Sequence, residues 1–144
     1  MHNKIINFID VKNLIKDLKR NHKRIIQCHG VFDLLHVGHI KHFEEAKSYG
    51  DVLIVSITPD RFVSKGPNRP AFNEKLRAEA IAALDVVDFV AINKWSTAIE
   101  TIKLLKPDLY VKGPDYKDYR QDLTGNIQLE EDAVKSVGDR KSVV

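Results

Sequence analysis

One stretch, GVFDLLHVGH at residues 30–39, constrains this chain more than any other. It follows a short apolar run, residues 24–28, that predicts a β-strand, and it leads into residues 40–49, whose apolar spacing predicts a helix ending at Gly50. A glycine-bearing turn from strand to helix is where α/β proteins bind phosphate, because the first N–H groups of the helix are unpaired and the helix dipole is positive there. The stretch therefore predicts a phosphate-handling site.

The composition is that of an ordinary soluble globular protein. Of the 144 residues, 43% are hydrophobic and 30% are charged, which suits one domain with a substantial core. The 23 basic and 20 acidic residues are spread along the chain, so the net charge of +3 indicates no nucleic-acid partner and suits an anionic small-molecule substrate. The single cysteine, Cys28, lies in an apolar strand, and no apolar run has the length of a membrane span or the character of a secretory signal. These features predict a cytoplasmic protein with no membrane partner.

Strand and helix patterns alternate along the chain. After a helix capped by Asp10, strands are expected at residues 24–28, 51–57, 88–92 and 108–112, and helices at 40–49, 74–84, from Ser96 or Thr97 to before Pro107, and 127–137. Residues 51–57 are almost unbrokenly apolar, as in a strand covered on both faces. Alternation with short connections favours parallel strands joined by right-handed crossovers. The expected fold is an α/β, Rossmann-like, doubly wound parallel sheet in three layers and a single domain.

The end of the chain does not continue this pattern. A fifth strand would complete such a sheet, yet residues 139–144, with the sequence DRKSVV, do not resemble a strand. The same string can be back-translated into the start of a common sequencing-library adapter. We therefore expect a domain at residues 1–138 that lacks its last strand, followed by a non-native tail at residues 139–144.

Two histidines carry the chemistry that the central stretch predicts. His36 and His39 are three residues apart at a helix start, so both rings can face one ligand, and Gly38 removes a side chain where a bulky anion would approach. Imidazole donors beside unpaired backbone N–H groups would stabilise charge on a phosphorus under attack, which suits phosphoryl or nucleotidyl transfer without a covalent intermediate. The chain lacks a P-loop and a GxGxxG motif. Spacing alone leaves two other interpretations open, zinc ligands and surface polar residues.

The central stretch resembles the GxFDxxHxGH signature of the cytidylyltransferase-like nucleotidyltransferases. Within that superfamily the chain is most similar to the nucleotidyltransferase domain of the ADP-heptose synthases. The likeness continues in order through residues 65–70 (KGPNRP), 77–84 (RAEAIAAL), 87–90 (VDFV) and 106–116 (KPDLYVKGPDY), and it spans roughly residues 24–137. Several motifs in the correct order are far more specific than one HxGH.

This resemblance implies a reaction and a set of site residues. A phosphate oxygen of the acceptor attacks the α-phosphorus of a nucleoside triphosphate, and pyrophosphate leaves. His36, His39 and Lys65 are the implied catalytic residues. The implied nucleotide-binding residues are Gly30, Val31, Phe32, Asp33, Gly38, Arg77, Lys112, Gly113 and Asp115. Asp33 is expected to hold the turn rather than act as a base, because a phosphate nucleophile is already ionised. Mg²⁺ bridging the triphosphate oxygens is expected, with no metal ligands supplied by the protein.

The identity of the substrates stays open at this stage. The favoured reading is ATP with a sugar phosphate such as heptose 1-phosphate. One alternative is CTP with glycerol phosphate or another polyol phosphate, and another is a nucleotide-binding module or fragment without turnover. The resemblance also implies a homodimer and a fused sugar-kinase domain as partners. In two respects the chain departs from its relatives, because His29 replaces a small polar residue or asparagine and a Ser/Thr-rich segment after the last strand is absent.

Overall fold

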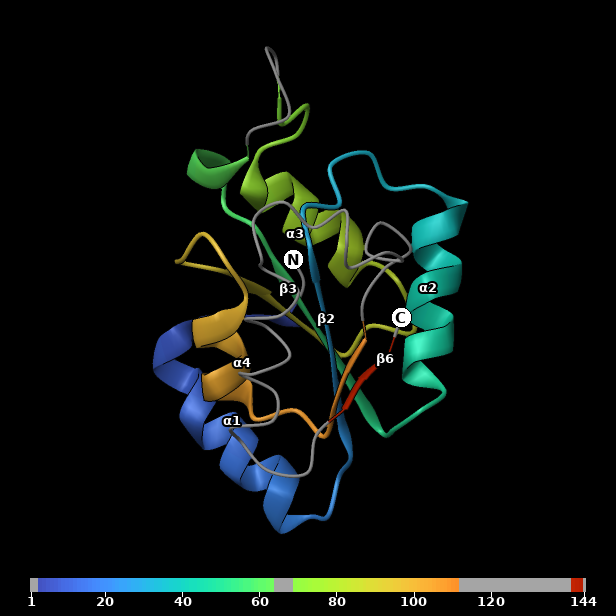
Figure 1. Ribbon diagram of the computed structural model, residues 1–144, viewed down its shortest axis with the longest axis vertical. Coiled ribbons are helices and arrows are strands. Elements are labelled where there is room, and N and C mark those ends of the chain that lie inside the picture. Colours follow the sequence, from blue (N-terminus) through green and yellow to red (C-terminus); the bar gives the residue numbers. More distant parts are fainter. Residues whose placement is uncertain (1–2, 64–68, 112–140, 144) are drawn as a thin grey trace.

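The fold is a parallel β-sheet covered by helices on both faces. The computed structural model describes residues 3–63, 69–111 and 141–143 (Figure 1). The strands are β1 (Ile5–Ile6), β2 (Ile25–Gly30), β3 (Val52–Ile57), β4 (Phe89–Ile92), β5 (Leu109–Val111) and β6 (Lys141–Val143). The helices are α1 (Phe8–Arg20), α2 (Val37–Lys47), α3 (Glu74–Ala82) and α4 (Ile99–Leu105), with a short 3₁₀ helix, η1 (Asp60–Phe62). This architecture confirms the predicted doubly wound α/β class.

The sheet order is β1-β4-β3-β2-β5-β6, and every pairing is parallel. From β2 the chain first builds β3 and β4 on one side, and it later returns to place β5 on the other side. Open α/β sheets bind ligands in the crevice at such a switch point, outside the carboxyl ends of the strands. The end of β2 and the end of β5 therefore mark the expected binding edge.

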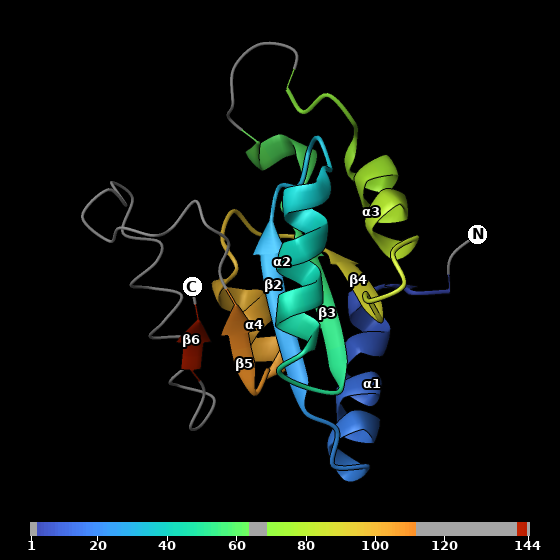
Figure 2. The same ribbon diagram turned by 90° about the vertical axis from the view of Figure 1, so that its right-hand side faces the viewer.

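Two apolar layers sandwich the sheet. Helices α2 and α3 pack on one face, where Phe43 and Ile81 join a buried cluster with alternate residues of β2, β3 and β4. Helices α1 and α4 cover the other face, where Val11, Ile15 and Leu105 pack on the intervening residues (Figure 2). All six residues of β3 are buried, as its almost unbroken apolar sequence predicts. No helix in the described parts of the chain is long and apolar enough to cross a membrane.

The helix starts differ in part from the sequence predictions. Helix α3 begins after Asn73, as predicted, and the Asn73 side chain accepts a hydrogen bond from the backbone N–H of Leu76. The predicted cap at Asp10 is wrong, since Asn7 caps α1 and accepts the N–H of Asp10 at 3.1 Å. Asp10 instead lies in the first turn, where its charge faces the positive end of the helix dipole. The expected helix at residues 127–137 lies outside the described residues.

A sixth strand forms where the sequence predicted none. The backbone of Lys141–Val143 pairs in parallel with β5, so the expectation of a sheet without its last strand is corrected. Side-chain patterns signal strands that bury one face, whereas pairing at a sheet edge needs only backbone N–H and C=O groups opposite an open neighbour. The sequence of this segment has no strand pattern, so its pairing with β5 was not predicted.

One buried guanidinium joins the loops at the binding edge of the sheet. The side chain of Arg77, at the start of α3, is 0% exposed. Its Nε donates to the carbonyl of Phe72, its Nη1 donates to the carbonyls of Val31 and Thr58, and its Nη2 lies 2.7 Å from Asp60 Oδ1. These bonds connect the loop after β2, the end of β3, η1 and the approach to α3. Arg77 thus fixes the relative positions of four segments.

A buried carboxylate makes the second connection between these loops. Asp33 is 8% exposed, and its oxygens accept hydrogen bonds from the backbone N–H groups of Ala71 and Phe72 and from Arg69. Burial alone would raise the pKa of Asp33, but the hydrogen bonds from Phe72, Ala71 and Arg69 outweigh it and lower the pKa below the ordinary value. Asp33 therefore remains ionised and holds the segment before α3 against the loop after β2.

Replacing Arg77 with methionine is expected to destabilise the protein by about 3 kcal/mol, because three carbonyls and one carboxylate lose their donor inside the protein. Urea unfolding measures the loss. The control is Arg20→Met, since Arg20 is 75% exposed in its ion pair with Asp17 and should change stability by less than about 0.5 kcal/mol. Equal effects of the two substitutions would contradict the assigned role of Arg77.

Replacing Asp33 with asparagine should cost about 2 kcal/mol at neutral pH, the worth of hydrogen bonds to a charged group. Because the folded pKa is lowered, the stabilisation is complete above about pH 4 and is lost as the pH falls through the folded pKa. The stabilities of wild type and Asp33→Asn should therefore converge below about pH 4. Unfolding curves from neutral to acid pH test this, with the exposed Asp17→Asn as control. Curves for Asp33→Asn and wild type that stay parallel into acid would refute the role of the ionised carboxylate.

Candidate active site

The two histidines of the central stretch cap the first turn of α2. His36 is the N-cap residue, and its Nδ1 accepts a hydrogen bond from the backbone N–H of Gly38 at 3.0 Å. His39 Nδ1 accepts the backbone N–H of His36 at 3.2 Å, so the pair forms a reciprocal capping box. The sequence predicted a helix from residue 40, whereas α2 begins at Val37, because these histidines supply the cap.

The capping box determines which nitrogen of each ring can serve a ligand. A ring nitrogen that accepts an N–H bond carries no proton, so both neutral imidazoles hold their proton on Nε2. The ring centroids of His36 and His39 lie 4.0 Å apart with an interplanar angle of 31°. The two imidazoles therefore lie side by side at the positive end of α2, each with its proton on Nε2. An anion such as a phosphate is the ligand this arrangement suits best.

Two glycines create room for ring side chains in this turn. A Cβ at Gly38 would lie 2.7 Å from the imidazole of His36, so Gly38 accommodates the capping ring itself. A Cβ at Gly30 would lie 2.9 Å from the ring of Phe32. Phe32 has φ 51°, a left-handed conformation that turns its ring inward against His39 and Phe43. The aromatic contact at 5.4 Å between the ring centroids of Phe32 and His39 helps to orient that imidazole.

The other predicted residues divide into structural ones and ones that lie outside the described chain. Val31 contributes a carbonyl to Arg77, and Asp33 holds residues 71–72. Arg77 was expected to contact phosphate, but in this structure four of its N–H donors bind protein oxygens and its side chain is buried, which makes it a positioning residue here. Lys65, Lys112, Gly113 and Asp115 lie outside the described residues, and their contacts stay predictions.

One side chain has a larger role than its sequence context indicated. Arg69 lies in the glycine- and proline-rich loop and resembles an ordinary exposed arginine in the sequence. Its Nη1 lies 3.0 Å from Asp33 Oδ2, and its side chain is 37% exposed. Arg69 therefore joins the loop that precedes α3 to the turn that carries the histidines.

A group of polar side chains lies at the ends of β2 and β3, and the sequence analysis singled out only one of them, His29. Gln27 and Ser56 are 0% exposed, Thr58 is 8% exposed, and His29 lies between them. The signal was present in the sequence, because Gln27, His29, Ser56 and Thr58 alternate with apolar residues in strands that are otherwise apolar. These four residues lie on the face of the sheet that α4 covers.

The carboxyl edge offers no protein-made metal centre in the described parts of the chain, where no group of three His, Cys, Asp or Glu residues is close enough together to hold an ion. Asp33, a buried carboxylate in the same loop as the histidines, already accepts three hydrogen bonds. Mg²⁺ keeps several waters and is commonly held through substrate phosphates. A magnesium ion carried on a triphosphate would need no cluster of carboxylates from the protein.

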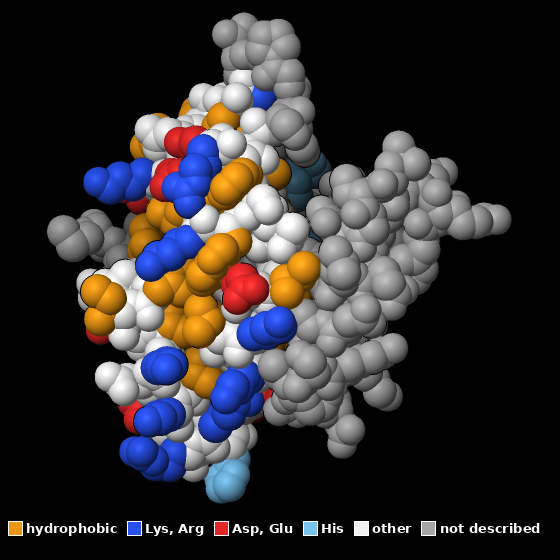
Figure 3. Space-filling model, turned by 60° about the vertical axis from the view of Figure 1, so that its left-hand side comes forward, with side chains coloured by type: hydrophobic (Ala, Val, Ile, Leu, Met, Phe, Trp, Pro, Cys, Tyr) orange, Lys and Arg blue, Asp and Glu red, His pale blue; other side chains and the backbone are white. Residues whose placement is uncertain are grey.

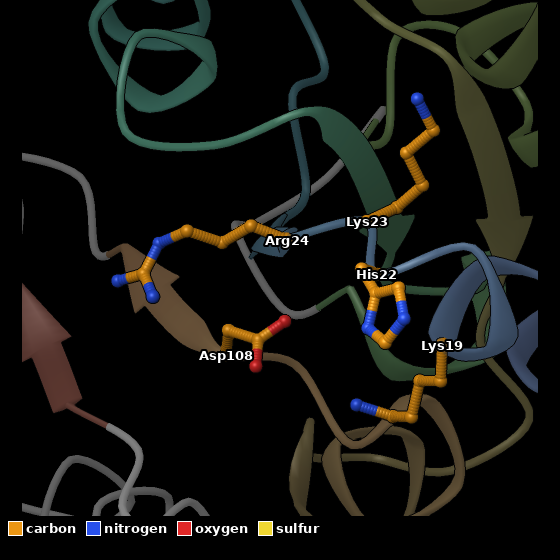
Figure 4. A pocket seen from close by; sticks show the side chains of 5 residues that line it. All are labelled: Lys19, His22, Lys23, Arg24 and Asp108. Atoms are coloured by element: carbon orange, nitrogen blue, oxygen red, sulfur yellow. The ribbon is translucent and has the colours of Figure 1, made fainter.

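A separate pocket of about 350 Å³ lies at the opposite, amino-terminal edge of the sheet (Figure 4). Its lining residues are Lys19, His22, Lys23, Arg24 and Asp108. Lys19 Nζ binds the carbonyl of Lys106, and Asp108 Oδ2 accepts the backbone N–H of Ile25, so these groups join α1 and α4 to the start of β2. This pocket is not part of the histidine site.

Figure 3 shows lysines and arginines gathered on one face of the molecule. Lys12, Lys16 and Arg20 of α1 are exposed.

Comparisons with known proteins agree with the geometry. "Bifunctional protein HldE" of Geobacter metallireducens is 41% identical over 143 residues, which cover 98% of this chain and 28% of that protein. The protein of that name from Campylobacter jejuni strain RM1221 is 49% identical over 109 residues, which cover 74% of this chain and 24% of the relative. The chain thus spans about a quarter of the length of these curated relatives.

Solved structures give the same fold. The lipopolysaccharide core biosynthesis protein from Thermoplasma volcanium superposes with a TM-score of 0.67 at 27% identity, covering 85% of this chain and 97% of that chain. The pantoate-beta-alanine ligase of Francisella tularensis superposes with a TM-score of 0.66 at 20% identity, covering 97% of this chain and 66% of that chain, a likeness of fold alone.

A family model described as Cytidylyltransferase-like matches residues 27–142, most of the chain. The matched region includes the capping-box histidines, the Arg77 connection and the switch point between β2 and β5. With this match and relatives at 41% and 49% identity, the chain belongs to the cytidylyltransferase-like family of nucleotidyltransferases.

Proposed function

We propose that this chain transfers a nucleoside monophosphate group from a nucleoside triphosphate to a sugar phosphate, with ATP and heptose 1-phosphate as the favoured pair. An oxygen of the acceptor phosphate forms a bond to the α-phosphorus, the bond from that phosphorus to the bridging oxygen breaks, and pyrophosphate leaves. The observation that supports this most directly is the His36–His39 capping box, in which both imidazoles accept with Nδ1 at the start of α2 and so carry their proton on Nε2.

Charge stabilisation and positioning account for the rate in this proposal. The acceptor phosphate is already ionised at neutral pH, so no general base is required. Charge grows on the non-bridging and leaving oxygens of the triphosphate as the bond breaks, and donors fixed before the reaction stabilise that charge without reorganising. The donors of His36 and His39 are fixed by the backbone of α2, and that turn is held by Asp33 and Arg77.

The choice of substrates rests on likeness to relatives. The relatives named HldE at 41% and 49% identity, together with the lipopolysaccharide core biosynthesis protein, support a heptose phosphate as acceptor. The relatives are bifunctional and about four times longer than the matched region, which supports a second domain in the full-length protein; a sugar kinase there would supply the phosphorylated acceptor. Lys65, Lys112, Gly113 and Asp115 are proposed to complete the contacts to phosphate and nucleotide, with Mg²⁺ carried on the triphosphate.

Pyrophosphate release measured with each of ATP, CTP, GTP and UTP against a panel of sugar and polyol phosphates tests the function. We expect release with ATP and heptose 1-phosphate above every other pair. Release with CTP and glycerol phosphate instead would show that the proposed substrates are wrong and that the proposed reaction class is right. Nucleotide binding without release from any pair would indicate a binding module and overturn the proposal.

Substitution of His36 separates catalysis from capping. Serine is a favoured N-cap residue, so His36→Ser keeps an acceptor for the first turn of α2 while removing the imidazole donor. We expect turnover to fall by about 100-fold or more, as for loss of an oxyanion-type donor, with stability within about 0.5 kcal/mol of wild type.

Substitution of His39 removes both roles at once. His39→Ala should lower turnover by orders of magnitude, as for His36→Ser, and should also cost about 1 kcal/mol of stability through the lost cap bond. Pyrophosphate release and thermal unfolding measure the two effects. Full turnover in either variant would show that the imidazoles only cap the helix.

A further inference from the structure

Two arginines near the start of α3 have different surroundings in the structure. The resemblance implied that Arg77 contacts phosphate, but four of its five N–H groups bind protein oxygens and its side chain is 0% exposed. The side chain of Arg69 is 37% exposed, and its Nη1 donates to Asp33 Oδ2 at 3.0 Å. Of these two arginines, only Arg69 can therefore be reached by a ligand.

The bond to Asp33 uses one nitrogen of the Arg69 guanidinium. Within residues 3–63, 69–111 and 141–143, Nη1 is the only nitrogen of this group that donates a hydrogen bond. Nε and Nη2 share one edge of the guanidinium plane, and two parallel N–H groups of this kind bind a carboxylate or phosphate in the bidentate manner. Asp33 therefore leaves one complete bidentate edge of Arg69 for an anion.

Asp33 orients Arg69 but does not depend on it. The carboxylate also accepts the backbone N–H groups of Ala71 and Phe72, so the segment before α3 stays held without the arginine. An ion pair with one partner more than a third exposed contributes little to stability. A long side chain that is already held in one place loses less conformational entropy when it binds a ligand. The pair thus suits binding better than it suits folding.

The ion pair lies in the loop that carries the histidines. Asp33 is three residues before His36, the N-cap of α2, in the loop that leaves the carboxyl end of β2. β2 lies at the switch point of the sheet, between β3 and β5, where open α/β sheets bind ligands. The hydrogen bond from Arg69 to Asp33 spans 36 residues of sequence and brings a permanent cation to this loop.

We infer that Arg69 binds a phosphate group of the substrates through Nε and Nη2, with Asp33 as its positioning residue. The inference rests on the proposed nucleotidyl transfer and adds a charged donor to the neutral imidazoles of His36 and His39. The triphosphate and the phosphorylated acceptor both offer the anionic oxygens that a guanidinium edge binds. This assignment moves the phosphate contact that was expected of Arg77 to Arg69.

Michaelis constants for the two substrates test the assignment and identify the phosphate. Arg69→Gln removes the charge and the paired donors, so the KM for ATP or for heptose 1-phosphate should rise by about 30-fold, the worth of hydrogen bonds to a charged group. Arg69→Lys keeps the charge without the bidentate edge and should recover only part of the loss. A rise for ATP assigns Arg69 to the triphosphate, and a rise for heptose 1-phosphate assigns it to the acceptor.

The control is Arg24→Gln, which removes the same charge at the amino-terminal edge of the sheet and should leave both constants within about twofold of wild type. Unchanged constants in Arg69→Gln, or equal rises in Arg24→Gln, would overturn the assignment.

Urea unfolding separates ligand binding from a structural role. Because two backbone N–H groups still hold Asp33, Arg69→Gln should unfold at nearly the same urea concentration as wild type. A raised Michaelis constant with an unmoved midpoint supports the contact to phosphate. A fall in the midpoint as large as that of Arg77→Met would show that Arg69 only holds the loop, and it would overturn the inference.

Calorimetric binding of ATP, heptose 1-phosphate and inorganic pyrophosphate provides a test that needs no turnover. Arg69→Gln should bind at least one of the three about 30-fold more weakly than wild type, whereas Arg24→Gln should bind all three as wild type does. Weaker binding in a protein that releases no pyrophosphate would keep the inference and reject the proposed reaction. Equal affinities of wild type and Arg69→Gln, in an enzyme that does release pyrophosphate, would keep the reaction and overturn the inference.

Discussion

The buried guanidinium of Arg77 is the interaction on which the binding edge of this protein depends. Loops that leave parallel strands have no ladder to hold them, and their carbonyls must find donors elsewhere. Arg77 supplies donors to Val31, Thr58 and Phe72 from one planar group and pairs with Asp60. A lysine at this position would offer a point charge instead of a fork with fixed directions. The shape of the edge is therefore set by one buried side chain whose N–H donors bind protein oxygens from four segments.

Asp33 and Arg77 both bind the backbone of the segment that precedes α3. Asp33 binds the N–H of Phe72, and Arg77 binds the carbonyl of the same residue. Residue 72 is thereby fixed through both of its backbone polar groups, although its side chain is 48% exposed. Fixing the backbone at this point holds the start of α3 against the turn of the histidines. A catalytic site that relies on donors in place before the reaction requires this kind of rigidity.

Much of the fold could be predicted from the sequence, because hydrophobic period and turn residues are local signals. The sequence predicted the almost unbroken apolar run of β3, the Asn73 cap of α3 and the alternation of strands and helices. Features that depend on partners distant in sequence could not be predicted. The inward-facing Arg77 and the pairing of Lys141–Val143 are two examples. The histidines were predicted to bind phosphate from spacing and resemblance, and that stays a prediction, whereas their capping role follows only from the backbone geometry of α2.

The start of α2 shows why a cap that is not optimal for the helix can suit a reaction. Serine, threonine, aspartate and asparagine are the preferred N-cap residues, and each uses its side-chain oxygen on the helix. An imidazole caps with one nitrogen, Nδ1, and carries its proton on the second, Nε2. A carboxylate in the same place would cap well but would repel a phosphate. Under the proposed function, histidine at positions 36 and 39 caps the helix and also supplies an N–H donor for an anion, which the preferred capping residues do not combine.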